Sequence, residues 1–207
     1  MNFQNMLISV PGIIIGFTIH EYCHAFAAYK LGDITVKEDG RLTFDPIKHI
    51  DIMGLIFIIF AGFGWAKPVQ FNPNMLKRPN RDRAIIAAVG PFSNLLLGVI
   101  FIFIMKGLWV LPVNDEKIID IVDFIIEILY YWAFTNVGLF VFNMLPIPPL
   151  DGSHIFLSGL NIRHETEVKI KRTGSLILFA LLIIQSATHI DILPIGNIVE
   201  KIMSVLY

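Results

Sequence analysis

The chain has 207 residues, of which 55% are hydrophobic and 16% are charged, and its formal net charge is −1. A soluble domain of this length carries more charged side chains on its surface, so the composition excludes an ordinary soluble fold. The near-zero charge gives no sign of the clustered basic face with which proteins bind nucleic acid. Together with a mean hydropathy of +0.69, these features predict a polytopic membrane protein in contact with the lipid bilayer.

Four apolar stretches reach or approach the length of about 20 residues that a helix needs to cross the hydrocarbon core. These predicted spans are 7–30, 84–105, 124–145 and 173–193. The first is expected to be a retained helix, because the residues before it lack the Lys or Arg of a secretory leader and because it contains ionisable side chains. The single cysteine, Cys23, excludes an internal disulfide.

Two extended segments are predicted between the first two spans. Residues 34–44, with the sequence ITVKEDGRLTF, place β-forming side chains on both sides of Asp39-Gly40, a pattern typical of a hairpin with a tight turn. A second extended piece is expected at 65–71, where Pro68 disfavours a helix.

The apolar run 52–64 is short for a span and is bounded by glycine, so it is expected to be re-entrant or tilted. In that case Lys and Arg concentrate in the loop after the first span and in the loop 146–172, whereas only Lys106 and Lys117 lie between the second and third spans. The positive-inside rule then places the basic loops in the cytoplasm and both termini outside. If 52–64 crossed the bilayer, the basic loops would lie on opposite sides of the membrane, and the positive-inside rule would not determine the orientation of the chain.

The end of the first span carries the sequence HEYCH, an H-E-x-x-H pattern formed by His20, Glu21 and His24. Residues four apart share one face of a helix, so both imidazoles can reach one metal ion, and Glu21 lies beside them. The alternative is a set of polar side chains paired with one another inside a helix bundle. Ionisable groups at this depth are costly and tend to mark function, which favours the metal site.

A zinc hydrolase uses a third protein ligand and keeps the fourth position open. Asp151 is the candidate, because Pro146, Pro148 and Pro149 before it must break the third span. Irregular backbone at membrane depth is tolerated where it lines a cavity, so this break can turn Asp151 towards the two histidines. Considered on spacing alone, however, an Asp followed by Gly favours a helix cap or a turn.

The two motifs together, HEYCH and NMLPIPPLDG at 143–152, resemble those of the site-2 protease family of intramembrane metalloproteases. The stretch GPFSN at 90–94 resembles a G-P-x-x-N motif of that family. GRLTFDPIKHID at 40–51 and FGWAKPVQFNP at 63–73 are similar to segments of its short bacterial and archaeal branch, which lacks a PDZ domain. The resemblance covers roughly residues 12–160.

The resemblance implies a role for each motif residue. His20, His24 and Asp151 would bind one Zn²⁺ per chain, Glu21 would be the general base, and Asn143 would help to hold the substrate or the developing oxyanion. The implied function is hydrolysis of peptide bonds within or next to transmembrane segments of membrane proteins, as in regulated intramembrane proteolysis, with the active site opening towards the cytoplasm. An exposed edge of the 34–44 hairpin would pair with the unwound substrate.

The expected fold class is an all-α polytopic membrane protein, a bundle of about four to five transmembrane helices with a small β-hairpin between the first two spans. It forms a single domain over 1–207, with a catalytic core at about 7–160 and an extra C-terminal span at about 173–193. Oligomeric state has no signal in the sequence.

Three points stay open at this level. Gly90, Asn94 and Gly98 recur every four residues, which indicates close helix packing, or an Asn94 that also faces the site. His154, three residues after Asp151, is either an interfacial residue or a partner of that carboxylate.

The function also has two rivals, an inactive metal-binding membrane scaffold and a small divalent-metal transporter. The intact Glu21 disfavours the scaffold. A transporter needs further ligands along a path, and the sequence offers only an acidic helix face formed by Asp120, Asp123 and Glu127.

Overall fold

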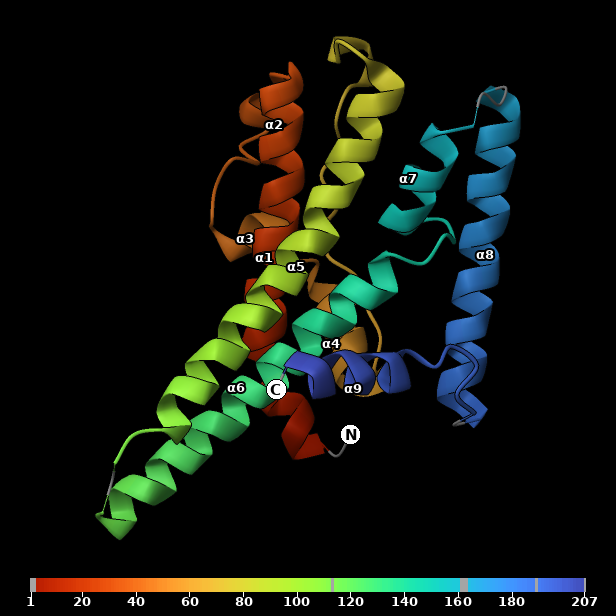
Figure 1. Cartoon of the computed structure of the whole chain (residues 1–207). Helices are drawn as coiled ribbons and strands as arrows, with labels where there is room; N and C mark the ends of the chain where they lie inside the picture. Colours follow the sequence, from red (N-terminus) through yellow and green to blue (C-terminus); the bar gives the residue numbers. More distant parts are fainter. Residues whose placement is uncertain (1–2, 113, 161–163, 189, 207) are drawn as a thin grey trace.

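The computed structural model describes residues 3–112, 114–160, 164–188 and 190–206. Over these residues the chain is mostly helical, and four helices are long and apolar enough to cross a membrane (Figure 1). They are α1 (Phe3–Leu31), α5 (Pro79–Trp109), α6 (Glu116–Asn143) and α8 (His164–Thr188). The four predicted spans are therefore confirmed as long apolar helices, but the third ends at Asn143 and the fourth at Thr188, before their predicted ends at 145 and 193; residue 189 lies outside the described residues. Each helix begins before its predicted start, because helical hydrogen bonding continues into polar turns that a count of apolar residues leaves out.

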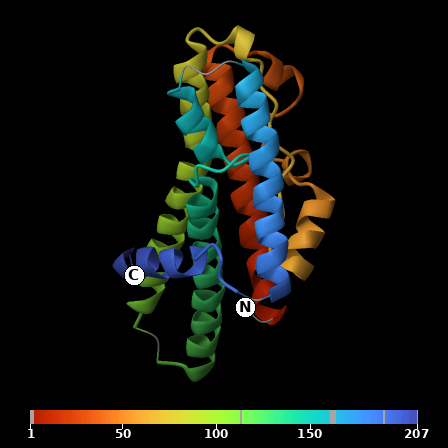
Figure 2. The same cartoon turned by 90° about the vertical axis from the view of Figure 1, so that its right-hand side faces the viewer.

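Helices α1, α5 and α6 form the central bundle, in which each of the three contacts the other two. Glycines allow the close approach: a Cβ on Gly12 of α1 would lie 2.7 Å from the Trp132 ring of α6, and one on Gly98 of α5 would lie 2.7 Å from Val137 Cγ2. The C-terminal helix α9 (Ile195–Leu206) crosses α6 and buries its apolar face there (Figure 2). These contacts close an apolar core on the side of the bundle away from the chemical motifs.

The segment predicted to be re-entrant forms a short helix and then turns back. Helix α4 (Ile52–Ala61) begins at the capping carboxylate of Asp51 and ends at Gly62, whose φ of +75° is the left-handed conformation that glycine favours. A helix of this length extends about 15 Å, half of a hydrocarbon core. The chain then returns, and Ala66 pairs with Ile50 in an antiparallel bridge. Both ends of the segment therefore lie together, which agrees with the re-entrant interpretation.

The β-hairpin predicted at 34–44 is wrong. These residues form the short helix α2 (Thr35–Glu38) followed by turns, and the described residues contain no strand. The Asp33 carboxylate accepts hydrogen bonds from the backbone N–H of Thr35 (3.0 Å) and from its hydroxyl (2.6 Å), which starts a helical turn. Gly40, with φ +67°, follows the helix end, so the residue expected to close a hairpin instead reverses the chain after α2.

Two further short helices, α3 (Pro46–His49) and the 3-10 helix η1 (Pro73–Met75), lie on either side of α4 in the sequence. The segment 65–71 between them is irregular and largely extended. Its Lys67 N–H donates to His49 O (2.8 Å), and the Arg41 guanidinium donates to Pro68 O (2.9 Å). These bonds hold the segment against the chain at Arg41 and His49.

The chain breaks after α6, as the prolines predict, and resumes in α7 (Asp151–Ser158). Helix α8 then lies beside the bundle rather than within it (Figure 1). Only 6% of the 18-residue apolar stretch of α8 is buried inside the protein, whereas 44% of the corresponding stretch is buried in α1 and in α5. An ion pair between Arg83 and Glu167 and close packing of Gly174 on Pro148 attach α8 to α5 and to the chain break.

Candidate metal centre

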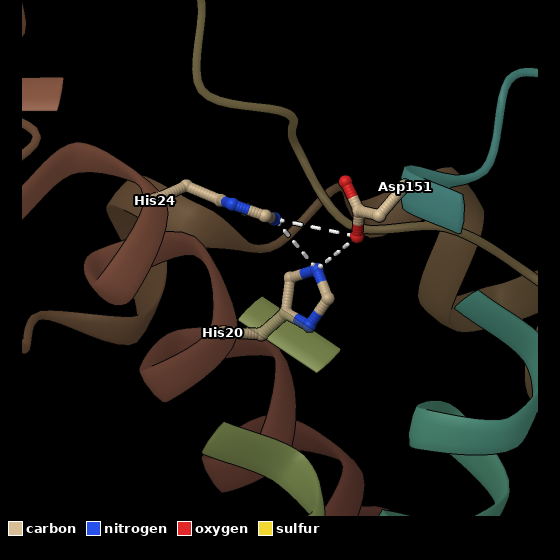
Figure 3. A group of neighbouring side chains, drawn as sticks. All are labelled: His20, His24 and Asp151. Atoms are coloured by element: carbon tan, nitrogen blue, oxygen red, sulfur yellow. Dashed lines mark hydrogen bonds and ion pairs between the residues drawn. The ribbon is translucent and has the colours of Figure 1, made fainter. Parts of the chain in front are cut away.

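His20 and His24 lie one turn apart on the same face of α1, as the H-E-x-x-H spacing predicts. Their Nε2 atoms are 2.9 Å apart and their rings are nearly perpendicular, with an interplanar angle of 85°. Both side chains are buried inside the protein. The two imidazoles thus present one ring nitrogen each to the same point (Figure 3).

Asp151 meets these histidines from the opposite side of that point (Figure 3). Its Oδ2 lies 3.1 Å from His20 Nε2 and 3.4 Å from His24 Nε2. Gly152 permits this position, because a Cβ there would lie 2.3 Å from Met144 O at the end of α6. Asp151 thus brings a carboxylate to the two imidazoles.

The remaining ring nitrogens are hydrogen-bonded to α5. His20 Nδ1 lies 2.6 Å from Asn94 Oδ1, and His24 Nδ1 lies 2.6 Å from the carbonyl oxygen of Ile86. A carbonyl oxygen only accepts hydrogen bonds, so each imidazole, in the neutral form that binds a metal, carries its proton on Nδ1. Their Nε2 lone pairs are therefore directed at each other and at the carboxylate.

This donor set fits a metal ion. Two imidazole nitrogens and a carboxylate oxygen converge within 4.8 Å of one another, so one cation at that point could contact all three. Two imidazoles and one carboxylate, each imidazole held by an outer hydrogen bond, form a ligand set that zinc accepts. Gly90 of α5 faces the pair, and a Cβ there would lie 2.4 Å from His24 Nε2. The glycine leaves room at the centre that any other residue would fill.

Glu21 is buried beside the two histidines, and its Oε2 accepts a hydrogen bond from the backbone N–H of Val69 (2.8 Å). The partner belongs to the irregular segment 65–71. The sequence did not indicate this contact, since it joins two residues far apart in the chain through a backbone group.

Asn143 is not brought into the cluster. It is the last residue of α6, and its side-chain amide donates to Leu139 O one turn back in the same helix (3.0 Å). Nor does His154 belong to the metal-ligand cluster that the described residues form, which consists of His20, His24 and Asp151. Asn94 does face the site, and the glycines around it also make close helix contacts, so both interpretations of the Gly90–Gly98 stripe hold together.

Comparison with known proteins agrees with this geometry. "Putative zinc metalloprotease YwhC" of Bacillus subtilis is 41% identical over 143 residues, which cover 69% of this chain and 64% of that protein. "Putative zinc metalloprotease Rip2" of Mycolicibacterium smegmatis is 29% identical over 184 residues, which cover 86% of this chain and 67% of the relative. The chain thus spans about two thirds of the length of these relatives.

No solved structure matches the chain. The family model described as "Peptidase family M50" matches residues 9–185, a range that contains both motifs and all four long helices apart from their outermost turns. The resemblance to the site-2 proteases is thereby confirmed. The chain belongs to peptidase family M50.

Proposed function

We propose that the chain is an intramembrane zinc metalloprotease that hydrolyses peptide bonds within or next to transmembrane segments of membrane proteins. The observation that carries the proposal is the convergence of His20, His24 and Asp151 on one point, with Glu21 adjacent in α1. Membership of family M50 and the names of the two relatives support it. The chain covers about two thirds of the length of these relatives, so the activity and the substrates of the whole relatives are carried to this chain only as a proposal.

His20 and His24, through Nε2, and Asp151, through Oδ2, would hold one Zn²⁺ per chain. When bound, zinc would act as a Lewis acid that polarises the scissile carbonyl and acidifies the attacking water. Glu21 is the general base, which takes a proton from the attacking water and returns it to the leaving amine. The Val69 N–H engages Oε2 of this carboxylate and holds it in one orientation, so that Oε1 is the oxygen available for the proton.

Asn143 is proposed to stabilise the negative charge that develops on the carbonyl oxygen during attack. Its amide would first have to release Leu139 O, to which it is hydrogen-bonded. A rotation of one side chain at the end of a helix is sufficient, and substrate binding can supply the energy for it.

An apolar cavity that reaches the helices carrying the site residues supports the substrate class. A cavity of about 810 Å³ lies between α1, α4, α6, α8 and α9, and its lining is mostly apolar. It includes Phe17, three residues before His20, and Leu139, four residues before Asn143. An apolar cavity at membrane depth supports a substrate that arrives through the bilayer, and its scissile bond must leave the helix because helical carbonyls are already hydrogen-bonded.

The orientation is also a proposal. Four membrane crossings place both termini on one side, and the basic loops near the metal centre then lie on the other. By the positive-inside rule this side is the cytoplasm, so the active site would open there.

Cleavage of a panel of single-span peptides by the purified protein tests the function. We expect cleavage that a chelator abolishes and zinc restores, and no cleavage by Glu21→Gln protein purified in the same way. Cleavage that persists in the chelator and in Glu21→Gln would come from a contaminant and would refute the proposal. Zinc flux into vesicles carrying the protein would instead favour the transporter, which the single ligand cluster of the described residues does not support.

A further inference from the structure

Two asparagines are fully buried in the middle of apolar membrane helices. Asn94 of α5 and Asn136 of α6 are both 0% exposed, in helices where a polar side chain is costly. Asn94 lies against His20, as described above. Asn136 touches no metal-ligand candidate, but its Oδ1 lies 3.1 Å from Asn94 Nδ2. The two side chains therefore form a line that runs from α6 through α5 to the metal centre on α1.

The hydrogen bonds in this line have only one possible direction. Asn136 Nδ2 donates to two backbone carbonyls, Gly12 O (3.2 Å) and Trp132 O (2.9 Å), so its oxygen must face Asn94. Asn94 then turns its own Nδ2 towards that oxygen and towards Gly16 O (3.1 Å). Its Oδ1 is left for His20 Nδ1, which must donate.

Glycines on α1 make room for this line. A Cβ on Gly16 would lie 2.6 Å from Asn136 Oδ1 and 3.2 Å from Asn94 Nδ2, and one on Gly12 would lie 2.7 Å from the Trp132 ring. Of the three carbonyls that orient the amides, the two on α1 thus belong to glycines, four and eight positions before His20. The arrangement is built into the contact of three helices and is not a local feature of the HEYCH turn.

We propose that Asn136 is a positioning residue of the metal centre, which acts through Asn94 to hold His20 as the Nδ1–H tautomer with Nε2 free to bind the metal. The inference rests on the proposed zinc site but not on proteolysis. Loss of an outer hydrogen bond to a metal-binding histidine typically lowers metal affinity roughly 10- to 100-fold. Asn136 would exert such an effect from α6, without touching any metal ligand.

Zinc affinity of the metal-free protein in detergent, measured by competition with a chelator, tests the relay. We expect Asn94→Leu to lower affinity roughly 10- to 100-fold and Asn136→Leu to lower it about tenfold. The double variant should lose no more than Asn94→Leu alone, because Asn136 acts only through Asn94. Thr135→Val is the matched control: its hydroxyl bonds only to Tyr131 O of its own helix, and its affinity should equal that of the unaltered protein.

A second variant separates positioning from folding. Asn136→Asp keeps an oxygen that accepts from Asn94 Nδ2 but buries an acid, so it should lower thermal stability and leave zinc affinity nearly unchanged. NMR of the labelled imidazole nitrogens should find His20 protonated on Nδ1 in the metal-free protein and partly on Nε2 in Asn136→Leu. Unchanged affinity and an unchanged tautomer in folded Asn136→Leu protein, or additive losses in the double variant, would overturn the inference. A protein that binds zinc in this way but cleaves no peptide would refute the proposed protease alone.

Discussion

Glu21 and the three ligand candidates have separable tasks, although Glu21 is adjacent to His20 in α1 and the three candidates converge on one point. Glu21 would move a proton, whereas His20, His24 and Asp151 would hold the metal, and an isosteric change can remove the first function without the second. The sequence predicted these four residues because both motifs are short and local. The H-E-x-x-H spacing puts two imidazoles on one helix face, and the prolines before Asp151 mark the break that frees it from the third span. The sequence could not predict the Val69 contact with Glu21, which is made by a backbone N–H.

Glu21→Gln should bind zinc normally and cleave roughly 100- to 10,000-fold more slowly, because the amide cannot accept the proton. Metal analysis and peptide cleavage on the same preparation measure both properties. Near-normal turnover by this folded variant would show that another group is the base.

Asp151→Ala should lose zinc affinity by more than the roughly 10- to 100-fold expected for an outer partner, since it removes a direct ligand. Competition with a chelator gives the affinity, and cleavage should fall with it. His154→Ala, on the same short helix, is the control and should keep its zinc. Full zinc occupancy in Asp151→Ala would exclude Asp151 as a ligand.

Val69→Pro removes the N–H that holds Glu21, whereas Val69→Ala keeps it. A hydrogen bond to a charged group contributes about 1.5 kcal/mol or more, so we expect turnover of Val69→Pro to fall about tenfold or more relative to Val69→Ala. Zinc content should be equal in the two variants. Equal turnover would mean that Glu21 needs no orientation from the segment 65–71.

The helices were predictable where apolar length decides the outcome, and the hairpin was not. All four long helices follow from stretches that can satisfy their backbone hydrogen bonds in a bilayer only as helices. In the loop 34–44 no such constraint applies, and the hydrogen bonds of Thr35 to the Asp33 carboxylate outweighed the β-forming side chains. A strand would also have needed a partner, and the chain on either side of the loop provides none among the described residues.

The contacts between helices were even less accessible to prediction. Asn136 is one of several polar residues in the third span, and its partners Asn94, Gly12 and Trp132 depend on how α1, α5 and α6 rotate against each other. Periodicity within one helix does not determine that rotation.

Helix packing at Gly90 gives a prediction of its own. Gly90→Ala would place a Cβ 2.4 Å from His24 Nε2 and 2.8 Å from His20 Nε2, so we expect it to lower zinc affinity at least about tenfold. Gly98→Ala on the same helix would crowd Val137 instead, at a cost of about 1–3 kcal/mol in stability, with zinc affinity unchanged. If both variants lost the metal to the same degree, the effect of Gly90 would be general packing.

The molecule as a whole consists of a tightly packed bundle and a loosely attached α8. The ion pair of Arg83 with Glu167 holds one end of α8, and Ser186 donates a hydrogen bond to Ala61 O (3.2 Å) near the other. Between these points most of the helix faces away from the protein. Lipid must therefore cover much of α8 in the membrane.

The proposed orientation can be tested on whole cells. In a Cys23→Ser background, a cysteine at exposed Asn114, between α5 and α6, should react with a membrane-impermeant maleimide from outside. A cysteine at exposed Lys77, before α5, should react only after the membrane is opened. The reverse pattern would place the metal centre on the outer side.

The spacing of Gly12, Gly16, His20 and His24 along α1 constrains how this sequence can change over evolutionary time. One residue inserted or deleted between Gly12 and His24 would rotate one part of the set by about 100° relative to the other and would separate the metal ligands from the carbonyls that orient their partners. Lineages descended from this chain should therefore conserve the count of residues from Gly12 to His24.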